Sequence, residues 1–366
     1  MRNIQRGLFF GIVLILLGAC DNPFLQKDGS PPFQDGSASH PFLVYNQTDL
    51  LKISKDTAGT AGDGLWTLEK HYKQMANITL TGEWTRIGVN TAGQQFTGSY
   101  DGGAKTITGL TFTTSTSSIH QGMFGFIGSG GVVKNLTLEG VSITAGDNTG
   151  GVVGTNNGTV ENCSVTGTVT GGNNTGGVVG QNGSGSGTAI VQNCSATGTV
   201  TGGNNAGGVA GSNNGGTVQN CYATGAVSGG GDYTGGVAGQ NFGNIVQNCY
   251  ALNPSVKSIP TMNVGRVTGF NAGVLYYNYA WNGMTVMQGT AADFTGGTAK
   301  PSIGDALNSI DGKGITAAEA KDQDAWDTAG FSFGTTDASP WVWQNGRMPR
   351  LYFEAAGRVW PSYLVD

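Results

Sequence analysis

The sequence predicts an all-β chain folded as a right-handed parallel β-helix (a β-solenoid), with a capping segment at each end and one or two short helices outside the repeats. Three observations predict this fold. Glycine supplies 65 of the 366 residues, charged residues make up only 11%, and one glycine-valine block recurs along the middle of the chain. Low charge argues against a disordered chain, and the lack of a Gly-X-Y period with only 10 prolines excludes collagen.

Residues 1–19 read as a processing signal rather than as part of the fold. Arg2 and Arg6 give this segment a basic start, and Leu8 to Leu17 are an apolar stretch too short for a typical membrane-spanning helix. Leu17-Gly18-Ala19-Cys20 resembles the bacterial lipobox, in which small residues precede a cysteine that is diacylated and becomes the mature N-terminus. The resemblance implies a lipid anchor at Cys20. The alternative is an ordinary secretory signal with an incidental cysteine.

Residues 20–41 are expected to be the lipidated N-terminus and a flexible tether, because they are rich in Pro, Ser, Gly and Asp. Removal of residues 1–19 leaves 16 basic and 23 acidic residues, a net charge of −7. A mildly acidic exported protein has no electrostatic reason to bind nucleic acid. We therefore expect a lipid-anchored protein of the bacterial cell envelope, at the outer membrane or cell surface, with membrane lipid as a partner of its acyl chains.

Residues 42–121 are expected to form an N-terminal cap and the first coils. A short helix over Thr48 to Lys55 would protect the open edge of the first coil.

Residues 122–280 carry the repeats. The block Gly150-Gly151-Val152-Val153-Gly154 recurs from Gly176, Gly207 and Gly235, so the first glycines of successive copies stand 26, 31 and 28 residues apart. The first valine of each copy should face inward and form one column inside the solenoid. A repeat of this kind is one supersecondary unit that buries its apolar face by stacking on its neighbours.

Each unit contains two further blocks. Val160 to Val165 (VENCSV) and Gly167 to Thr170 (GTVT) both have copies in the later units. The unit therefore offers three short β-branched strands, and no window carries apolar residues at helical spacing. Three strands in a unit of this length match one coil of a solenoid, whereas a propeller blade needs about 40 residues.

Side-chain alternation locates a corner in each coil. Val160, Cys163 and Val165 should all be buried, but they cannot share one face of an unbroken strand, so the chain should bend at Asn162. Asparagine tolerates left-handed backbone and suits such a corner. We expect an internal ladder of stacked amides and a parallel file of cysteines, formed by Asn162, Asn193, Asn220 and Asn248 and by Cys163, Cys194, Cys221 and Cys249.

The four repeat cysteines could form disulfides in an exported protein. Their Cβ vectors would be parallel rather than convergent, and the repeat explains their spacing without any bridge, so we favour reduced, buried thiols. The repeats contain no Cys-x-x-Cys pair and no histidine, so neither a metal site nor a cofactor is expected.

The motifs Gly-Gly-Val-Val-Gly-x-Asn, at 150–156 and 176–182, and Asn-Cys-Tyr-Ala, at 220–223 and 248–251, are the most specific signals in the chain. They resemble the GLUG-motif proteins of bacterial surfaces, and the resemblance extends over nearly all of residues 42–353. It implies a β-helix and a surface location. It implies no catalytic residues in the repeats.

Residues 281–366 are expected to be an aromatic-rich C-terminal cap, because they hold five of the seven tryptophans. Burial of these rings should seal the last coil, as terminal repeats require. Thr316-Ala317-Ala318-Glu319 has the spacing of a capping box, which predicts the start of a short helix.

One row of side chains is a candidate binding strip. If the cysteines point inward, the residues after them point outward, which places Tyr222, Tyr250 and Tyr279 on successive rungs. Exposed stacked aromatics suit sugar rings or a protein partner. The alternative is that the tyrosines are a platform covered by the C-terminal segment.

Three functions remain open, and the first is favoured. The protein could be a non-catalytic surface adhesin that binds a glycan or a host or matrix protein. It could be a polysaccharide-acting enzyme, which an acidic cluster drawn from Glu83, Asp101 and Asp324 would favour. It could also be a structural envelope protein that associates with itself. The scarcity of ionisable residues between 140 and 250, where only Asp147, Glu161 and Asp232 occur, argues against an enzyme.

Overall fold

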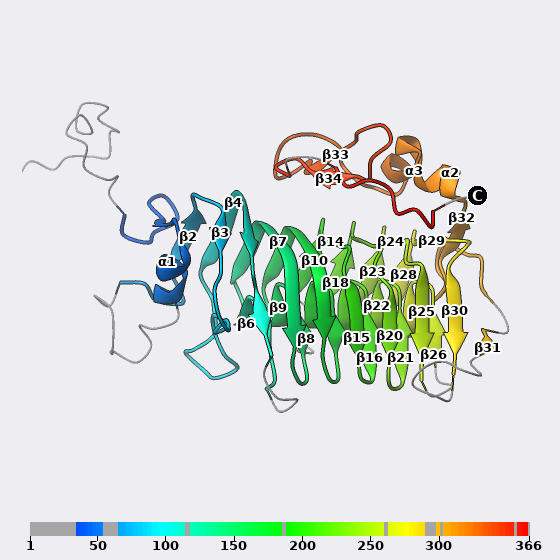
Figure 1. Ribbon diagram of the computed structural model, residues 1–366, viewed down its shortest axis with the longest axis horizontal. Coiled ribbons are helices and arrows are strands. Elements are labelled where there is room, and N and C mark those ends of the chain that lie inside the picture. The colour runs from blue at the N-terminus through cyan, green and yellow to red at the C-terminus, as the bar shows by residue number, and fades with distance from the viewer. Residues whose placement is uncertain are drawn as a thin grey trace, which may run out of the picture.

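The computed structural model describes residues 34–53, 65–113, 118–184, 188–259, 263–289, 298–300, 303–354 and 357–364. Over these residues the chain winds into a parallel β-helix, with the C-terminal segment lying beside it (Figure 1). The predicted fold class is therefore confirmed. Cys20, the signal segment and the tether up to residue 33 lie outside the described residues.

The coils contribute strands to three sheets. The long sheet contains β1 Phe42–Val44, β2 His71–Gln74, β3 Ile78–Thr79, β4 Ser99–Thr108, β5 Thr111–Phe112, β7 Val132–Thr144, β10 Thr159–Thr170, β13 Ile190–Gln192, β14 Ser195–Ala196, β15 Thr199–Gly202, β18 Thr217–Gln219, β19 Tyr222–Ala223, β20 Val227–Gly229, β23 Ile245–Gln247, β24 Tyr250–Ala251, β25 Ser255–Ser258, β28 Val274–Tyr276, β29 Tyr279–Trp281, β30 Thr285–Gln288, β31 Thr298–Ala299 and β32 Lys313–Ile315. A five-stranded sheet contains β8 Thr149–Gly150, β11 Thr175–Gly176, β16 Asn205–Gly207, β21 Tyr233–Gly235 and β26 Asn263–Gly265. A six-stranded sheet contains β6 Phe124–Ile127, β9 Val153–Asn156, β12 Val179–Asn182, β17 Ala210–Asn214, β22 Ala238–Phe242 and β27 Thr268–Asn271.

Strand register stacks like residues over one another and builds the core. One inward column of the long sheet runs through every coil, and none of its members is more than 5% exposed: Phe42, Tyr72, Tyr100, Val133, Val160, Val191, Val218, Val246 and Leu275. The predicted valine column is also fully buried at Val152, Val178, Val209, Val237 and Val267. Each fully buried side chain of this size contributes about 1.5–3 kcal/mol.

The corner predicted at Asn162 is present. Asn162, Asn193, Asn220 and Asn248 all have left-handed backbone, with φ between 52° and 54°, which reconciles the burial of Val160, Cys163 and Val165 with strand alternation.

The predicted internal amide ladder, in contrast, is formed by a different row. Asn162 is fully buried and its amide donates to Asn135 Oδ1 at 3.1 Å. Asn193, Asn220 and Asn248 are only half-buried, and among the described residues no amide–amide bond joins them to one another. The interior ladder consists of the asparagines that end the Gly-Gly-Val-Val-Gly-x-Asn motif, joined by Nδ2–Oδ1 bonds of 2.7–2.9 Å: Asn156, Asn182, Asn213, Asn241 and Asn271. The assignment from sequence was wrong for Asn193, Asn220 and Asn248 because both rows recur with the same period, and the period alone does not show which row stacks amide on amide.

The cysteines lie in one file, as predicted. All four are fully buried, and none forms a disulfide: Cys163, Cys194, Cys221 and Cys249. The backbone N–H of Cys194 donates to Cys221 Sγ at 3.4 Å, so this sulfur accepts from the preceding rung. Burial raises the pKa of the Cys194 thiol well above its usual value, which favours the protonated, unreactive form.

The N-terminal end is closed by α1 (Gln47–Lys52), close to the predicted helix. Asn46 caps it by accepting from Asp49 N at 3.1 Å, and Leu50 and Ile53 are fully buried against the first coil.

The last coil is closed by a buried charged network rather than by aromatic rings. Arg266 and Asp311 are each 2% exposed. The Arg266 guanidinium donates to backbone oxygens of Gly304, Asp311 and Gly312, and Asp311 accepts from Lys300 Nζ at 2.6 Å.

Most of the C-terminal segment lies along the side of the solenoid. We call residues 316–364 the arm; it contains α2 (Ala317–Ala320), α3 (Gln323–Thr328) and the hairpin of β33 (Trp341–Val342) and β34 (Arg350–Leu351). The predicted capping box at Thr316 and Glu319 is present. The arm runs back from the last coil along the side of the long sheet (Figure 1). Lys300 and residues 303–312 of the C-terminal segment do close the last coil, but through polar groups, so the prediction that buried aromatic rings seal it was wrong.

Candidate binding face

The tyrosine strip predicted as a binding surface is covered by the arm. Tyr222 is 1% exposed and Tyr250 is fully buried. Trp326 stacks on Tyr250 with ring centroids 3.9 Å apart, and its edge-on contact with Tyr222 is at 5.6 Å. Their hydroxyls donate to arm carbonyls, from Tyr222 to Pro349 and from Tyr250 to Ala325, each at 2.8 Å.

The row ends at Tyr279, which is half-buried and stacks on Tyr250 at 5.0 Å. Burial raises the pKa of Tyr222 to about 12. The prediction of an exposed strip was therefore wrong, and the tyrosines are the platform on which the arm docks.

A second outward row of the long sheet is uncovered at its C-terminal end. Register places Glu161, Gln192, Gln219, Gln247 and Tyr276 on successive rungs. Gln192 Nε2 donates to Glu161 Oε2 at 2.7 Å, and each later glutamine donates to the one before it at 2.8 Å. We call Gln192, Gln219 and Gln247 the glutamine row. These bonds hold the three amides in fixed orientations.

An exposed aromatic pair ends the glutamine row. Tyr276 and Tyr277 are 44% and 40% exposed, and their rings meet edge to face at 4.1 Å. Tyr277 has left-handed backbone, with φ 50°. Phe242 and Val274, more than half exposed, lie on the same end of the solenoid. Sequence reasoning missed this pair. The signal was available, because Leu275-Tyr276-Tyr277 aligns with Val246-Gln247-Asn248, so two tyrosines stand where the preceding repeat has a glutamine and an asparagine.

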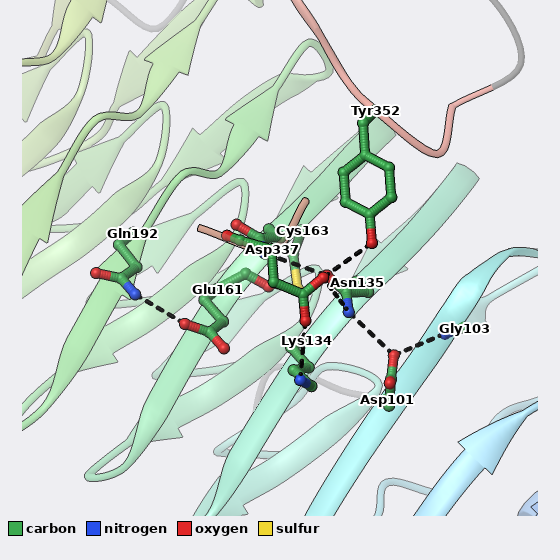
Figure 2. Close-up of polar contacts among 10 residues, drawn as sticks. Asp101, Gly103, Lys134, Asn135, Glu161, Cys163, Gln192, Asp337 and Tyr352 are labelled. Carbon is green, nitrogen blue, oxygen red and sulfur yellow. Dashed lines mark hydrogen bonds and ion pairs between the residues drawn. The ribbon is translucent and has the colours of Figure 1, made fainter. Parts of the chain in front are cut away.

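The arm is tied to the other end of this row through Asp337. Its carboxylate accepts from Tyr352 OH at 2.8 Å, Lys134 Nζ at 3.1 Å and Asn135 Nδ2 at 3.3 Å, and its backbone oxygen accepts from Asn162 Nδ2 at 3.3 Å. Figure 2 shows these donors directed at Asp337. Burial opposes ionisation, but the bonds from Tyr352, Lys134 and Asn135 outweigh it and lower the pKa of Asp337.

Between the arm and the corner asparagines lies a polar groove of about 490 Å³. It is lined by Glu161, Gln192, Asn193, Asn220, Gly330, Ser332, Asp337 and Ala338. The groove therefore begins on the glutamine row and ends at the Asp337 tether, and its lining offers carboxylates, amides and a hydroxyl.

The proposed acidic cluster of Glu83, Asp101 and Asp324 does not assemble. Glu83 accepts from Thr113, and Asp324 lies in the first turn of α3. Asp101 instead lies near Asp337, because Asn135 Nδ2 donates to both carboxylates, at 3.1 and 3.3 Å. Within the described ranges no three His, Cys, Asp or Glu side chains are grouped to hold a metal ion.

No helix in the part of the chain that the structure describes is long and apolar enough to cross a membrane.

A family described as the GLUG motif matches residues 145–170 and 171–201, two adjacent coils of the solenoid. These coils are GLUG repeats, which confirms the resemblance seen in the sequence.

Relatives share only part of the chain. Halomucin of Haloquadratum walsbyi is 32% identical over 159 residues, which are 40% of this chain and 2% of halomucin. A "Putative Gly-rich membrane protein" of Evansella cellulosilytica is 30% identical over 141 residues, 36% of this chain and 15% of that protein. The chain thus spans a small part of the length of the curated relatives it matches.

The fold also occurs in a solved structure. A "putative immunoglobulin A1 protease" from Bacteroides ovatus matches with a TM-score of 0.65 over 88% of this chain and 95% of that chain, at 19% identity. At this identity the likeness concerns the fold alone.

Proposed function

We propose that this GLUG-repeat protein is a lipid-anchored component of the bacterial cell envelope that binds glycans without catalysis. The observation that carries the proposal is the exposed pair Tyr276 and Tyr277 at the end of the glutamine row. Aromatic faces stack on sugar rings, while oriented amides exchange hydrogen bonds with sugar hydroxyls.

The geometry of the row suits an extended chain. Rungs of a parallel sheet are about 4.8 Å apart, which is close to the length of one sugar residue in an extended polysaccharide. Glu161, the three glutamines and Tyr276 therefore offer one polar or aromatic contact for each successive residue of such a chain. A protein partner has no such period, so we favour a glycan over a matrix protein.

The variant Tyr276→Gln/Tyr277→Asn tests the proposal. It gives the last rung the residues of the preceding one, Gln247 and Asn248, so the fold and the left-handed corner should be kept. We expect binding on a glycan array to fall at least about tenfold, the loss of one to two aromatic contacts. Tyr45→Gln, at a similarly exposed tyrosine, is the matched control. Unchanged binding of the double variant would refute the role of this pair.

The envelope location is supported by the Leu-Gly-Ala-Cys20 motif and by the name of the Evansella relative as a membrane protein. Cells expressing the chain should incorporate labelled palmitate into it, and Cys20→Ala should abolish the label and release the protein from membranes. Palmitate incorporation by the Cys20→Ala variant would remove the anchor from the proposal.

A second candidate is a polysaccharide-acting enzyme, which the approach of Asp101 and Asp337 to one amide favours. Paired carboxylates cleave glycosides when one is held protonated by a raised pKa, whereas the pKa of Asp337 is lowered. Release of reducing ends from a bound glycan, lost in Asp101→Asn, would establish this activity in place of simple binding.

A further inference from the structure

From the groove between the arm and the corner asparagines we infer the class of glycan: the site accepts neutral or amine-bearing sugars and rejects acidic ones. The inference rests on the proposed glycan binding and adds its selectivity.

The lining of the groove is acidic and contains no base. Glu161 and Asp337 are both among its residues, and it includes no Lys, Arg or His. The ammonium of Lys134, which lies beside the groove, is ion-paired with Asp337 at 3.1 Å. Although burial opposes this, the bond and charge of Asp337 raise the pKa of Lys134 and keep it charged for that pair. A uronate or sulfate entering the groove would therefore meet two carboxylates and no free cation.

The two charged groups of the groove, Glu161 and Asp337, accept hydrogen bonds, whereas its amides and its hydroxyl can also donate. The Nε2 and Oε1 atoms of Gln192 are used within the row, by Glu161 and Gln219. Asn220 Oδ1 is buried without a hydrogen-bond partner, and Glu161 uses Oε2 for Gln192. Carboxylates accept only, so beside Glu161 and Asp337 the groove favours a ligand group that donates. Sugar hydroxyls and amino groups donate.

The volume of the groove also suits a small ligand such as a short stretch of sugar residues. About 490 Å³ lies within the range of small-ligand sites, about 300–1,000 Å³. Because the groove opens onto the glutamine row through Gln192, a chain held in the groove can continue toward Tyr276.

Glu161→Gln is a clean test of the charge. The new glutamine is isosteric and can still accept from Gln192, so it extends the glutamine row by one rung while removing a carboxylate. Glu69→Gln removes the same charge from an exposed position in the first coils and is the matched control. The full-length protein is assayed against three probes of equal length: oligomers of glucose, of glucosamine and of galacturonate.

We expect the wild type to bind the glucose or glucosamine oligomer about tenfold or more tightly than the galacturonate oligomer. Glu161→Gln should narrow this ratio several-fold, as should about 1 M salt, while Glu69→Gln should not. Equal or tighter binding of galacturonate by the wild type would overturn the inference and leave glycan binding intact. If the protein binds none of the three probes and no glycan on the array, both the inferred selectivity and the proposed glycan binding are overturned.

Discussion

The interior asparagine ladder should be a main source of stability, and Asn182 is its best-placed member. Its Nδ2 donates to Asn213 Oδ1 at 2.9 Å and to Thr217 O at 3.1 Å, and its Oδ1 accepts from Asn156 Nδ2 at 2.9 Å. The side chain is fully buried. Three hydrogen bonds at about 1 kcal/mol each, together with about 0.5–1 kcal/mol for glycine within a strand, predict that Asn182→Gly lowers the free energy of unfolding by about 3–4 kcal/mol.

Asn193→Gly is the matched comparison, because Asn193 is the equivalent member of the corner row. Its φ of 53° is left-handed, which glycine adopts without strain, and it is half-buried at the groove. Relief of strain offsets the greater freedom of glycine in the unfolded chain, so we expect a change within about 1 kcal/mol. Urea unfolding followed by far-UV circular dichroism measures the free energy of unfolding of both variants. An equal loss in the two variants would contradict the assignment of the interior ladder.

Three further outcomes are expected. Trp326→Ala removes a fully buried ring that contacts Tyr222 and Tyr250, so it should weaken docking of the arm by about 3–5 kcal/mol and make the arm sensitive to trypsin. Trp343 is only half-buried, so Trp343→Ala should make the arm less sensitive to trypsin than Trp326→Ala does. An arm that stays protected in Trp326→Ala would show that its other contacts hold it in place. The pKa of Asp337 lies below 3.8 in the folded protein, so its bonds stabilise the docked arm above that pH and are lost as pH falls through the lowered value. Amide exchange over residues 330–340, measured relative to the intrinsic exchange rate at each pH, should therefore accelerate in the wild type as the pH falls below the ordinary pKa of an aspartate, and Asp337→Asn should show no such step. In a Cys20→Ser chain, a thiol reagent should label none of the four repeat cysteines until the protein unfolds; labelling of the native protein would mean that the coils open.

The repeat by itself determined the solenoid, because a fixed period and side-chain alternation are local properties. Val160, Cys163 and Val165 required a bend, and Asn162 was the residue able to make it; its φ of 53° bears this out. The file of buried cysteines followed from the same reasoning.

Tertiary structure decided which repeated residues face solvent. Alternation correctly turned Tyr222 and Tyr250 outward from the coil, but the arm that covers them docks through carbonyls 127 and 75 residues further along the chain. No periodicity within the repeats reports such a contact, because periodicity reflects the packing of each coil on its neighbours alone. Asp337 accepts a hydrogen bond from Lys134, which lies 203 residues before it in the sequence, and it lines the groove. For the same reason its role could be found only in the folded protein.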